Sequence, residues 1–407
     1  MLATLVVCSL GCAAQSSVDH APAALAPPLR VYSLRADALQ RAKQRVHGTS
    51  SAAAYTRLVS EADAALQAGP FSVMDKRRVP PSGDRHDYVS LGPYWWPDPN
   101  KADGLPYIRR DGERNPEISS DYDAPRFGAL TGAVTTLALA YYFSDDEKYA
   151  ARAALLLRVW FLDAATRMNP HLRYGQRIPG ITEGRAAGII ETRRLVDLVD
   201  AIGMLERSPA WTDADARGMR AWMAAYRRWL LTSEIGKEEQ RARNNHGTWY
   251  DAQIAALALF TGDTALARST IEASKTRRIA AQIMPDGRQP YELARTRSLG
   301  YSVMNLEGLC RLAELGRHVG VDLWSYASPD GGSIRRALDY VAPYADTTRK
   351  WPGAQITPNA PDFLVLILER ARIAYGDGYG ELLRKIPGDL VLSHRAQLLY
   401  PDPNPAP

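Results

Sequence analysis

Cysteine is scarce in this sequence of 407 residues, which contains only Cys8, Cys12 and Cys310. The first two lie in an N-terminal segment that we expect to be removed, so the mature chain keeps a single cysteine. One cysteine forms neither an intrachain disulfide framework nor a cysteine-ligated metal cluster. The hydrophobic residues, 46% of the chain, instead supply enough apolar side chains for a sizeable core.

Runs of basic residues and long apolar segments are lacking as well. The net charge of +5 is small for this length and is not concentrated in a Lys/Arg cluster, which argues against a nucleic-acid-binding protein. Past the N-terminus we expect no segment to span a membrane. The modest basic balance is compatible with a polyanion held in a cleft, and equally with chance.

The N-terminus, MLATLVVCSLGCAAQSS, is a short apolar run followed by small residues. This pattern is typical of a secretory signal, and we predict a signal peptide over residues 1–14. A Pro- and Ala-rich linker follows, over residues 15–28. Attachment of a lipid to Cys12 is the alternative, although Ser9 and Leu10 fit the required motif poorly. We expect an exported protein located in the periplasm.

Strand-like alternation is also scarce, whereas helical patterns with caps recur. Ser144 and Glu147 have the spacing of a capping box. Thr212 precedes a helical pattern with acidic residues in its first turn. Gly262 and Asp263 separate two further helical patterns. These signals predict a chain of helices joined by short turns.

Helices joined in this way indicate αα-hairpins. At about 50 residues per hairpin, roughly six or seven hairpins fit into the chain. We therefore predict an all-α fold, an incomplete α/α toroid over residues 29–385, with long loops over a cleft. Residues 386–407 are predicted to form a C-terminal tail with a frayed end.

Three stretches interrupt the helical pattern, at residues 88–123, 169–183 and 351–361. They are rich in proline, glycine, aromatic residues and arginine. Long loops inside a compact fold usually carry function. We therefore expect these three loops to contribute to a site.

The stretch RNNHGTWYD at residues 243–251 places two amides and an imidazole before an apolar helical pattern. The N–H groups and dipole of a helix start favour a bound anion. An asparagine donates hydrogen bonds without charge, and a histidine exchanges a proton near neutral pH. Asn245 and His246 could thus hold a carboxylate and handle a nearby proton, with Asn244 as the cap. The alternative is an N-cap beside a structurally satisfied histidine.

Residues 291–309 carry Arg295, Arg297 and Tyr301 on a predicted helix. One helical turn separates Arg297 from Tyr301, so the two side chains could share a face. An arginine beside the phenol would lower the tyrosine pKa, which suits a residue that acts first as a base and then as an acid. The alternative is an amphipathic helix with a core tyrosine.

A proline-bounded loop contains Tyr94, Trp95 and Trp96, and Arg109 and Arg110 follow it. Aromatic faces in loops offer amphipathic surfaces that suit the apolar faces of sugar rings. Arginine suits bidentate carboxylate contacts. The loop is therefore a candidate substrate-binding segment, or else a lid that only packs on the core.

The loop HLRYGQRIPGITEGR adds Tyr174, Gln176 and Arg185, with His171 as a lesser candidate. These residues stand among proline and glycine turns. They could line the same cleft as the aromatic loop. A purely structural loop is the alternative for each of them.

Four blocks, at residues 88–117, 178–190, 244–251 and 292–301, resemble the alginate lyase superfamily of polysaccharide lyases in the same order. The resemblance spans about Tyr88 to Glu314. It is closer to family 38 than to the mannuronate lyases of family 5. In family 5 the segment from arginine to tyrosine is one residue longer and histidine flanks the tyrosine, whereas here Gly300 and Ser302 flank it. This difference bears on substrate preference rather than on the reaction type.

The resemblance implies an α/α toroid that cleaves a 4-linked polyuronate such as alginate, or else glucuronan. It implies a β-elimination without metal or cofactor that leaves 4,5-unsaturated uronate ends. Asn245 and Arg295 match the residues that neutralise the uronate carboxylate. His246 matches the catalytic histidine and Tyr301 the tyrosine acid and base. The same residues leave open whether the chain acts as a monomer or an oligomer.

Two other classes are compatible with the sequence. A hydrolase on the same toroid would use two carboxylates that flank the scissile bond. The carboxylates available for it are Asp98, Asp111, Glu183, Glu191 and Glu292. A polysaccharide-binding protein without activity would need no reactive Tyr301 or His246.

Overall fold

The computed structural model describes residues 28–48, 51–119 and 121–401. The predicted signal peptide, with Cys8 and Cys12, and all but the last residue of the predicted linker lie outside these residues. Cys310 is buried and free. The single cysteine predicted for the mature chain is therefore a thiol within the core.

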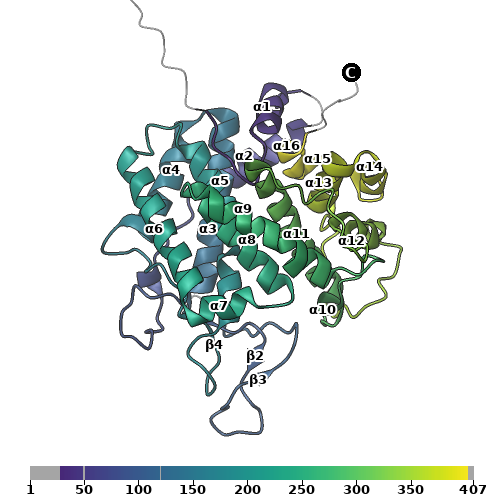
Figure 1. Ribbon diagram of the computed structural model, residues 1–407. Coiled ribbons are helices and arrows are strands. Elements are labelled where there is room, and N and C mark those ends of the chain that lie inside the picture. The colour runs from purple at the N-terminus through teal and green to yellow at the C-terminus, as the bar shows by residue number, and fades with distance from the viewer. Residues whose placement is uncertain (1–27, 49–50, 120, 402–407) are drawn as a thin grey trace, which may run out of the picture.

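Helices dominate the described chain (Figure 1). Those of the first half are α1 (Ala36–Arg45), α2 (Ala52–Ala65), α3 (Asp123–Ser144), α4 (Glu147–Leu157), α5 (Leu195–Leu205) and α6 (Asp213–Thr232). Those that follow are α7 (Glu234–Gln240), α8 (Asn245–Phe260), α9 (Thr264–Ser274), α10 (Pro290–Leu293) and α11 (Ser298–Gly316). The last are α12 (Ile334–Val341), α13 (Val365–Tyr375), α14 (Gly378–Leu383), α15 (Gly388–Ser393) and α16 (Ala396–Leu399). The all-α prediction is confirmed.

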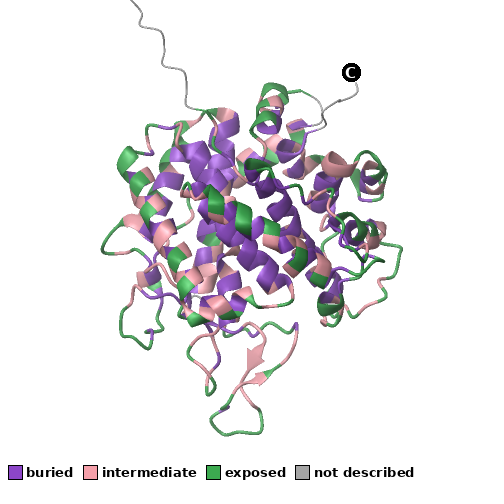
Figure 2. Ribbon diagram, viewed as in Figure 1, coloured by how far each residue is buried: buried purple, intermediate pink, exposed green. Residues whose placement is uncertain are grey.

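Four helices, α3, α5, α8 and α11, form the centre of the molecule and contact one another in that order. They carry buried side chains on all sides, as expected for helices surrounded by protein (Figure 2). In α8 every residue is buried except His246. The amphipathic helices α4, α6, α9 and α12 cover this centre from outside. An inner and an outer layer of helices result.

The C-terminal helices complete the body. Helix α15 packs on α2, and α16 packs on α1, α2 and α13, so that the first and last helices of the described chain meet (Figure 1). Leu398, Leu399 and Tyr400 are buried, and the Tyr400 hydroxyl accepts a 2.7 Å hydrogen bond from Arg370 Nε. The prediction of a tail over residues 386–407 is therefore wrong up to Pro401. Two short helices with few apolar residues escaped the periodicity on which the prediction relied.

Two of the predicted helix caps are confirmed and one is corrected. Thr212 caps α6 in a capping box with Asp215, and Asp263 caps α9. Ser144 is not a cap but the last residue of α3. Asp146 caps α4 instead, because its side chain accepts from the backbone N–H of Lys148.

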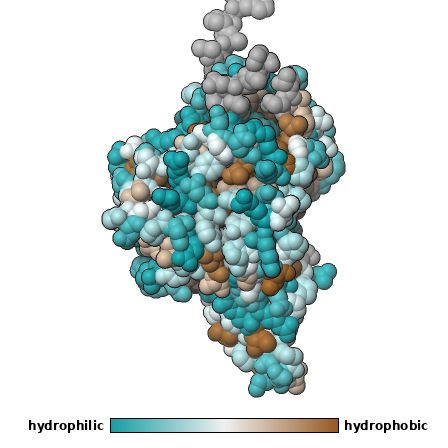
Figure 3. Space-filling view, turned by 90° about the vertical axis from the view of Figure 1, so that its right-hand side faces the viewer, coloured by the Kyte–Doolittle hydropathy of each residue, from teal (hydrophilic) through white to brown (hydrophobic). Residues whose placement is uncertain are grey.

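The loops at residues 88–123 and 169–183 lie together at one end of the helical body. Strand β1 (Val89–Leu91) pairs in parallel with β4 (Tyr174–Arg177). Strand β2 (Trp95–Trp96) pairs antiparallel with β3 (Ile108–Arg109), with Trp95 opposite Arg109. These loops form a narrow, mainly hydrophilic projection in Figure 3. Two of the three predicted loops thus lie together at this end, and the third, residues 351–361, lies beside the start of α11, where the Ser298 hydroxyl donates to the Ala354 carbonyl.

Helix α3 meets the length and hydropathy expected of a membrane-spanning helix, and 72% of its apolar window is buried inside the protein. The sequence interpretation found no such segment after the N-terminus. The apolar residues of α3 instead contact α2, α4 and α5. In this structure α3 is a core helix of the body.

We predict that a chain ending at Lys385 is much less stable than one ending at Pro401. The shorter chain loses the burial of Ile386, Leu398, Leu399 and Tyr400, each worth about 2 kcal/mol. Thermal unfolding followed by circular dichroism measures the difference. Equal melting temperatures would contradict the packing of α15 and α16.

Candidate active site

A cavity of about 760 Å³ opens where the loops meet the ends of α7, α8 and α11. Ten of the thirteen predicted site residues line it. They are Tyr94, Trp95, Arg109, Gln176, Arg185, Asn244, Asn245, His246, Arg295 and Tyr301. Residues that are up to 207 positions apart in the chain therefore share one cavity.

The first turn of α8 forms one wall. Asn244 caps the helix, and its side-chain oxygen accepts from the backbone N–H of His246 at 3.3 Å. Asn245 is fully buried. Its backbone N–H and its side-chain amide donate to the two carboxylate oxygens of Glu292, at 2.6 and 2.7 Å. Burial raises the pKa of Glu292, and the bonds from Asn245 oppose that rise.

His246 is fixed by a carboxylate from the preceding helix. Its Nδ1 lies 2.7 Å from Glu239 Oε1, and Glu239 on α7 is only 3% exposed. Sequence reasoning missed Glu239 because nothing in its spacing connects it to His246. Asn245 and His246 themselves lie at the start of a helix, as the sequence motif predicted.

Tyr301 forms the opposite part of the site. Arg295 Nη2 donates to the Tyr301 hydroxyl at 2.9 Å, and that hydroxyl donates to the Tyr94 hydroxyl at 2.6 Å. The guanidinium carbon of Arg295 also lies 3.9 Å from the centre of the Tyr301 ring. A phenol, a cation and a second phenol thus form one hydrogen-bonded chain.

The predicted pairing of Arg297 with Tyr301 is wrong, as is the predicted direction of the tyrosine pKa. Arg297 is the N-cap of α11, and the arginine that hydrogen-bonds the Tyr301 hydroxyl is Arg295. Burial and the adjacent Tyr94 raise the pKa of Tyr301, and Arg295 opposes that rise without reversing it.

Arg295 is held by Asp111, which comes from the loop at the other side of the site. Arg295 Nε donates to Asp111 Oδ1 at 3.0 Å and Arg295 Nη2 to the same oxygen at 2.6 Å. The backbone N–H of Thr296 donates to Asp111 Oδ2. Burial alone would raise the pKa of Asp111, but these bonds hold it well below its usual range. Asp111 thereby orients the Arg295 side chain and favours its charged form.

Arg185 and Gln176 line the cavity beside Trp95. Arg185 Nη2 donates to Gln176 Oε1 at 2.6 Å, and its guanidinium lies 5.9 Å from the Trp95 ring centre. Burial, assisted by the nearby Arg109, lowers the pKa of Arg185. Gln176 has a φ of 49°, in the bulged part of the β1–β4 pair.

Three predicted substrate-binding residues lie outside the cavity. Trp96 donates from Nε1 to the Glu113 carbonyl at 3.0 Å and stacks under Arg110 at 5.0 Å. Tyr174 is buried in a small cluster with Val89 and Leu91. Trp96 is turned away because it alternates with Trp95 along β2, whereas Tyr174 and Gln176 are separated by the register shift of the β1–β4 pair and the φ of 49° at Gln176. They lie outside the lining of this cavity, and their contact with a substrate stays a prediction.

The lesser candidate His171 is bound elsewhere, with Nε2 2.9 Å from Asp87. The carboxylates considered for a hydrolase all have protein partners. Asp111 binds Arg295, Glu292 binds Asn245, Glu191 binds Tyr88 and Ser90, Glu183 binds Arg177, and Asp98 binds the Asn100 backbone. The five therefore serve as hydrogen-bond acceptors rather than as a matched pair across the cavity.

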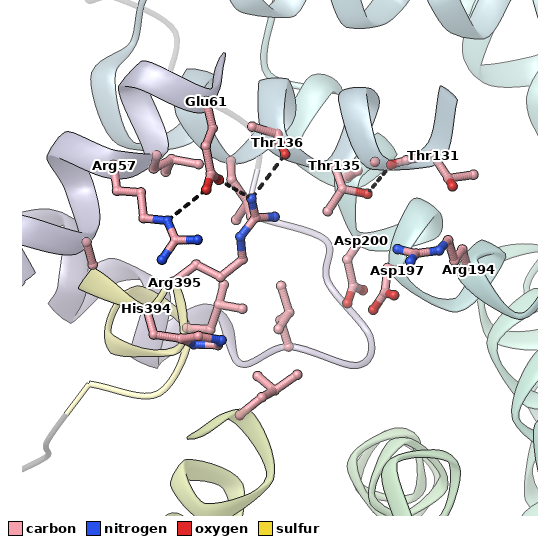
Figure 4. A pocket seen from close by; sticks show the side chains of 18 of the residues that line it. Arg57, Glu61, Thr131, Thr135, Thr136, Arg194, Asp197, Asp200, His394 and Arg395 are labelled. Carbon is pink, nitrogen blue, oxygen red and sulfur yellow. Dashed lines mark hydrogen bonds and ion pairs between the residues drawn. The ribbon is translucent and has the colours of Figure 1, made fainter. Parts of the chain in front are cut away.

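A second cavity of about 490 Å³ lies further along the inner helices (Figure 4). Arg194 lines both cavities. In the second one, Arg57 and Arg395 both bind Glu61. Among the described residues, no group of three His, Cys, Asp or Glu side chains could hold a metal ion. The four predicted catalytic residues all line the first cavity.

Comparison with known proteins decides the family. The sequence profile named alginate lyase matches residues 72–351. The chain belongs to the alginate lyase family. Its class is therefore that of the polysaccharide lyases. A crystal structure of an alginate lyase from Bacteroides ovatus is 43% identical, with a TM-score of 0.87, over 91% of this chain and 99% of that one.

Two more distant structures share the fold. Alginate lyase A1-III from Sphingomonas species A1 is 18% identical with a TM-score of 0.57, over 90% of this chain and 95% of that one. A form of A1-III complexed with a tetrasaccharide is 17% identical with a TM-score of 0.58, over 92% and 96%. The α/α toroid prediction is confirmed. A search of curated protein sequences found no match.

We predict that Asp111→Asn lowers the free energy of unfolding by about 2 kcal/mol at neutral pH, because it weakens the charged hydrogen bonds to Arg295. The pKa of Asp111 is depressed in the folded protein, so its stabilisation is complete above the usual aspartate pKa and is lost as the pH falls below it. The gap between the melting temperatures of wild type and variant should therefore narrow towards about pH 3. A gap that stays constant with pH would contradict this role.

Proposed function

We propose that this protein cleaves a 4-linked polyuronate, alginate in the first instance, by β-elimination. The observation that carries the proposal is the convergence of Asn245, His246, Arg295 and Tyr301 on one cavity. A polyuronate presents one carboxylate per sugar, and the cavity is lined by several guanidinium groups. These are Arg109, Arg114, Arg185, Arg193, Arg194, Arg241 and Arg295. The lining thus suits the charge of the substrate.

The first requirement of the reaction is to make the C5 proton removable. Its removal places charge on the adjacent carboxylate as an enolate. Donors aimed at that carboxylate stabilise the charge as it develops. Asn245 at the start of α8 and Arg295, which Asp111 orients, are the groups suited to this task.

The second requirement is a base and an acid. Where the C5 proton lies on the same side as the leaving oxygen, Tyr301 as a phenolate takes it and then returns it to that oxygen. Where the proton lies on the opposite side, His246 takes it and Tyr301 supplies the proton to the leaving oxygen. In both cases the bond from C4 to oxygen breaks without water, and a double bond forms between C4 and C5.

Export to the periplasm is part of the proposal, and it rests on residues 1–14 alone. Their apolar run and small residues are typical of a secretory signal. Sequencing the N-terminus of the protein recovered from a periplasmic fraction tests it. An uncleaved chain in the cytoplasmic fraction would contradict it.

We predict that Tyr301→Phe lowers kcat by at least about a thousandfold, because the acid and base is removed. Binding of alginate, measured by calorimetry, should stay within a factor of about three, since the arginines remain. Turnover is followed by the ultraviolet absorbance of the unsaturated ends on a panel of mannuronate, guluronate, mixed alginate and glucuronan. Cleavage without absorbance would indicate hydrolysis, and full activity in Tyr301→Phe would refute the mechanism.

We predict that Tyr94→Phe shifts the rising limb of the pH profile for polymannuronate to lower pH. Burial and Tyr94 raise the pKa of Tyr301, and the phenolate forms above that pKa. Loss of the Tyr94 hydroxyl lowers the pKa, so the phenolate appears at lower pH. Tyr107→Phe, which loses a hydroxyl bound to Glu117 outside the cavity, is the control. A shift to higher pH would contradict the assignment.

A further inference from the structure

A smaller cavity of about 260 Å³, here called the side cavity, adjoins the active-site cavity at Tyr301. Four residues line both cavities, namely Tyr94, Arg193, Tyr301 and Met304. The other residues of the side cavity are Arg297, Gly300, Val303, Glu307, Asn359 and Phe363. The residues assigned to the uronate carboxylate, Asn245 and Arg295, line only the active-site cavity. Tyr301 therefore lies at the boundary between the two cavities.

The third loop, residues 351–361, forms one wall of the side cavity and is fixed against the start of α11. Arg297 and Gln355 form an isolated antiparallel bridge. The Ser298 hydroxyl donates to the Ala354 carbonyl at 2.8 Å. The loop that had no part in the active-site cavity is thus attached to the residues that precede Tyr301, and it contributes to the space beside it.

The side cavity offers hydrogen-bond donors that no protein group uses. Within the described part of the chain, the side chains of Arg297 and Asn359 form no hydrogen bond or ion pair. The charge of Arg193 is partly balanced, because Glu307 lies near enough to interact with it. Arg297 is therefore the cation of this cavity whose N–H groups are free, and a free guanidinium suits a carboxylate.

Gly300 keeps the side cavity open beside Tyr301. A Cβ atom at this position would have the Asn359 side-chain oxygen as its close neighbour, at 3.6 Å, which is an ordinary contact. Because Gly300 lies within α11, a larger side chain would fit the backbone and extend into the cavity. The missing side chain thus supplies room for a ring, and Phe363 offers an apolar surface to the C–H face of a sugar.

We propose that the side cavity binds the uronate on the leaving-oxygen side of the scissile bond, with its carboxylate held by Arg297 and Asn359. The inference rests on the proposed β-elimination and extends it to a second sugar. The sugar that loses its C5 proton places its carboxylate at Asn245 and Arg295, in the active-site cavity. The oxygen that Tyr301 protonates belongs to the next sugar. Since Tyr301 borders both cavities, that sugar enters the side cavity.

Such a site makes the protein select for uronates on both sides of the bond that it cleaves. A neutral sugar in the side cavity would leave the Arg297 guanidinium without an anion. The chain should therefore cleave preferentially where two uronates follow each other. The sugar in the side cavity becomes the new reducing end of one product, so its identity can be determined after the reaction.

The test uses a polyuronate that the wild-type chain cleaves, polymannuronate in the first instance. Part of its carboxylates are reduced to alcohols, which converts mannuronate to mannose, and the original reducing ends are capped. Mass spectrometry of labelled products measures the new reducing ends. Wild type should place mannuronate there in at least about tenfold excess over mannose, corrected for the composition of the polymer, because a hydrogen bond to a charged group contributes that much.

The deciding variant is Arg297→Gln. It should reduce the excess of mannuronate ends to less than about threefold and raise KM on intact polymannuronate at least about tenfold, with kcat within about threefold. Arg297→Lys keeps the charge and should retain part of the excess. Arg349→Gln, at an exposed position just before the third loop, is the control and should match wild type.

A second variant, Gly300→Leu, fills the side cavity and leaves every hydrogen-bonding side chain in place. It should lower kcat/KM on intact polymannuronate at least about tenfold, with the melting temperature of wild type. Unchanged kcat/KM would show that no sugar enters the side cavity and would overturn the proposal. Asn359→Ala replaces Arg297→Gln as the deciding variant if the latter does not fold.

Equal corrected proportions of the two reducing ends in wild type, or an excess that Arg297→Gln leaves unchanged, would overturn the proposal and leave the β-elimination standing. A lower kcat with unchanged reducing ends would do the same, because Arg297 would then act through Tyr301 rather than on a second sugar. Absence of unsaturated products from every polyuronate would overturn the proposed function and this inference together.

Discussion

The burial of α8 is the constraint on which the site depends. A helix enclosed by protein along its length must have the polar groups of its first turn satisfied, since no water reaches them freely. Asn244 and Glu292 bind N–H groups of that turn. His246 is the single residue of the helix that is not buried. The polar start of an otherwise apolar helix thus becomes the place where chemistry can occur, and the inner helices that enclose α8 fix its position.

Around this helix the acidic residues and the basic residues have different roles. Carboxylates hold the reactive groups, the half-buried Asp111 on Arg295 and the buried Glu292 and Glu239 on Asn245 and His246. Arginines line the space left for the substrate. Each of these three acids is engaged by a protein donor. The toroid supplies the rigid inner helices, and the loops supply the residues that close the site.

The sequence carried enough information for the fold class and for most of the cavity, because caps, helical periodicity and polar helix starts are local signals. Asn245, His246, Arg295 and Tyr301 could be selected because each stands at or near a helix boundary in an unusually polar motif. Glu239 could not, since EIGKEEQ is indistinguishable from an ordinary solvated helix until α6 and α8 are placed beside it. The choice of Arg297 over Arg295 failed for a related reason, because Arg295 precedes α11 and reaches the Tyr301 hydroxyl from outside the helix, where helical spacing gives no guidance. Tyr174 lies outside the cavity because the β1–β4 pair is irregular at Gln176, an irregularity that the sequence pattern does not reveal.

The contact between α1 and α16 has a topological consequence. The first and last helices of the described chain lie side by side on the body, so the helices follow one another around the molecule without a natural first member. The order of the elements along the polypeptide is then one of several orders that would trace the same arrangement. A linker between the two ends, with a new opening in an exposed loop remote from the cavity, would preserve every inner-helix contact described above.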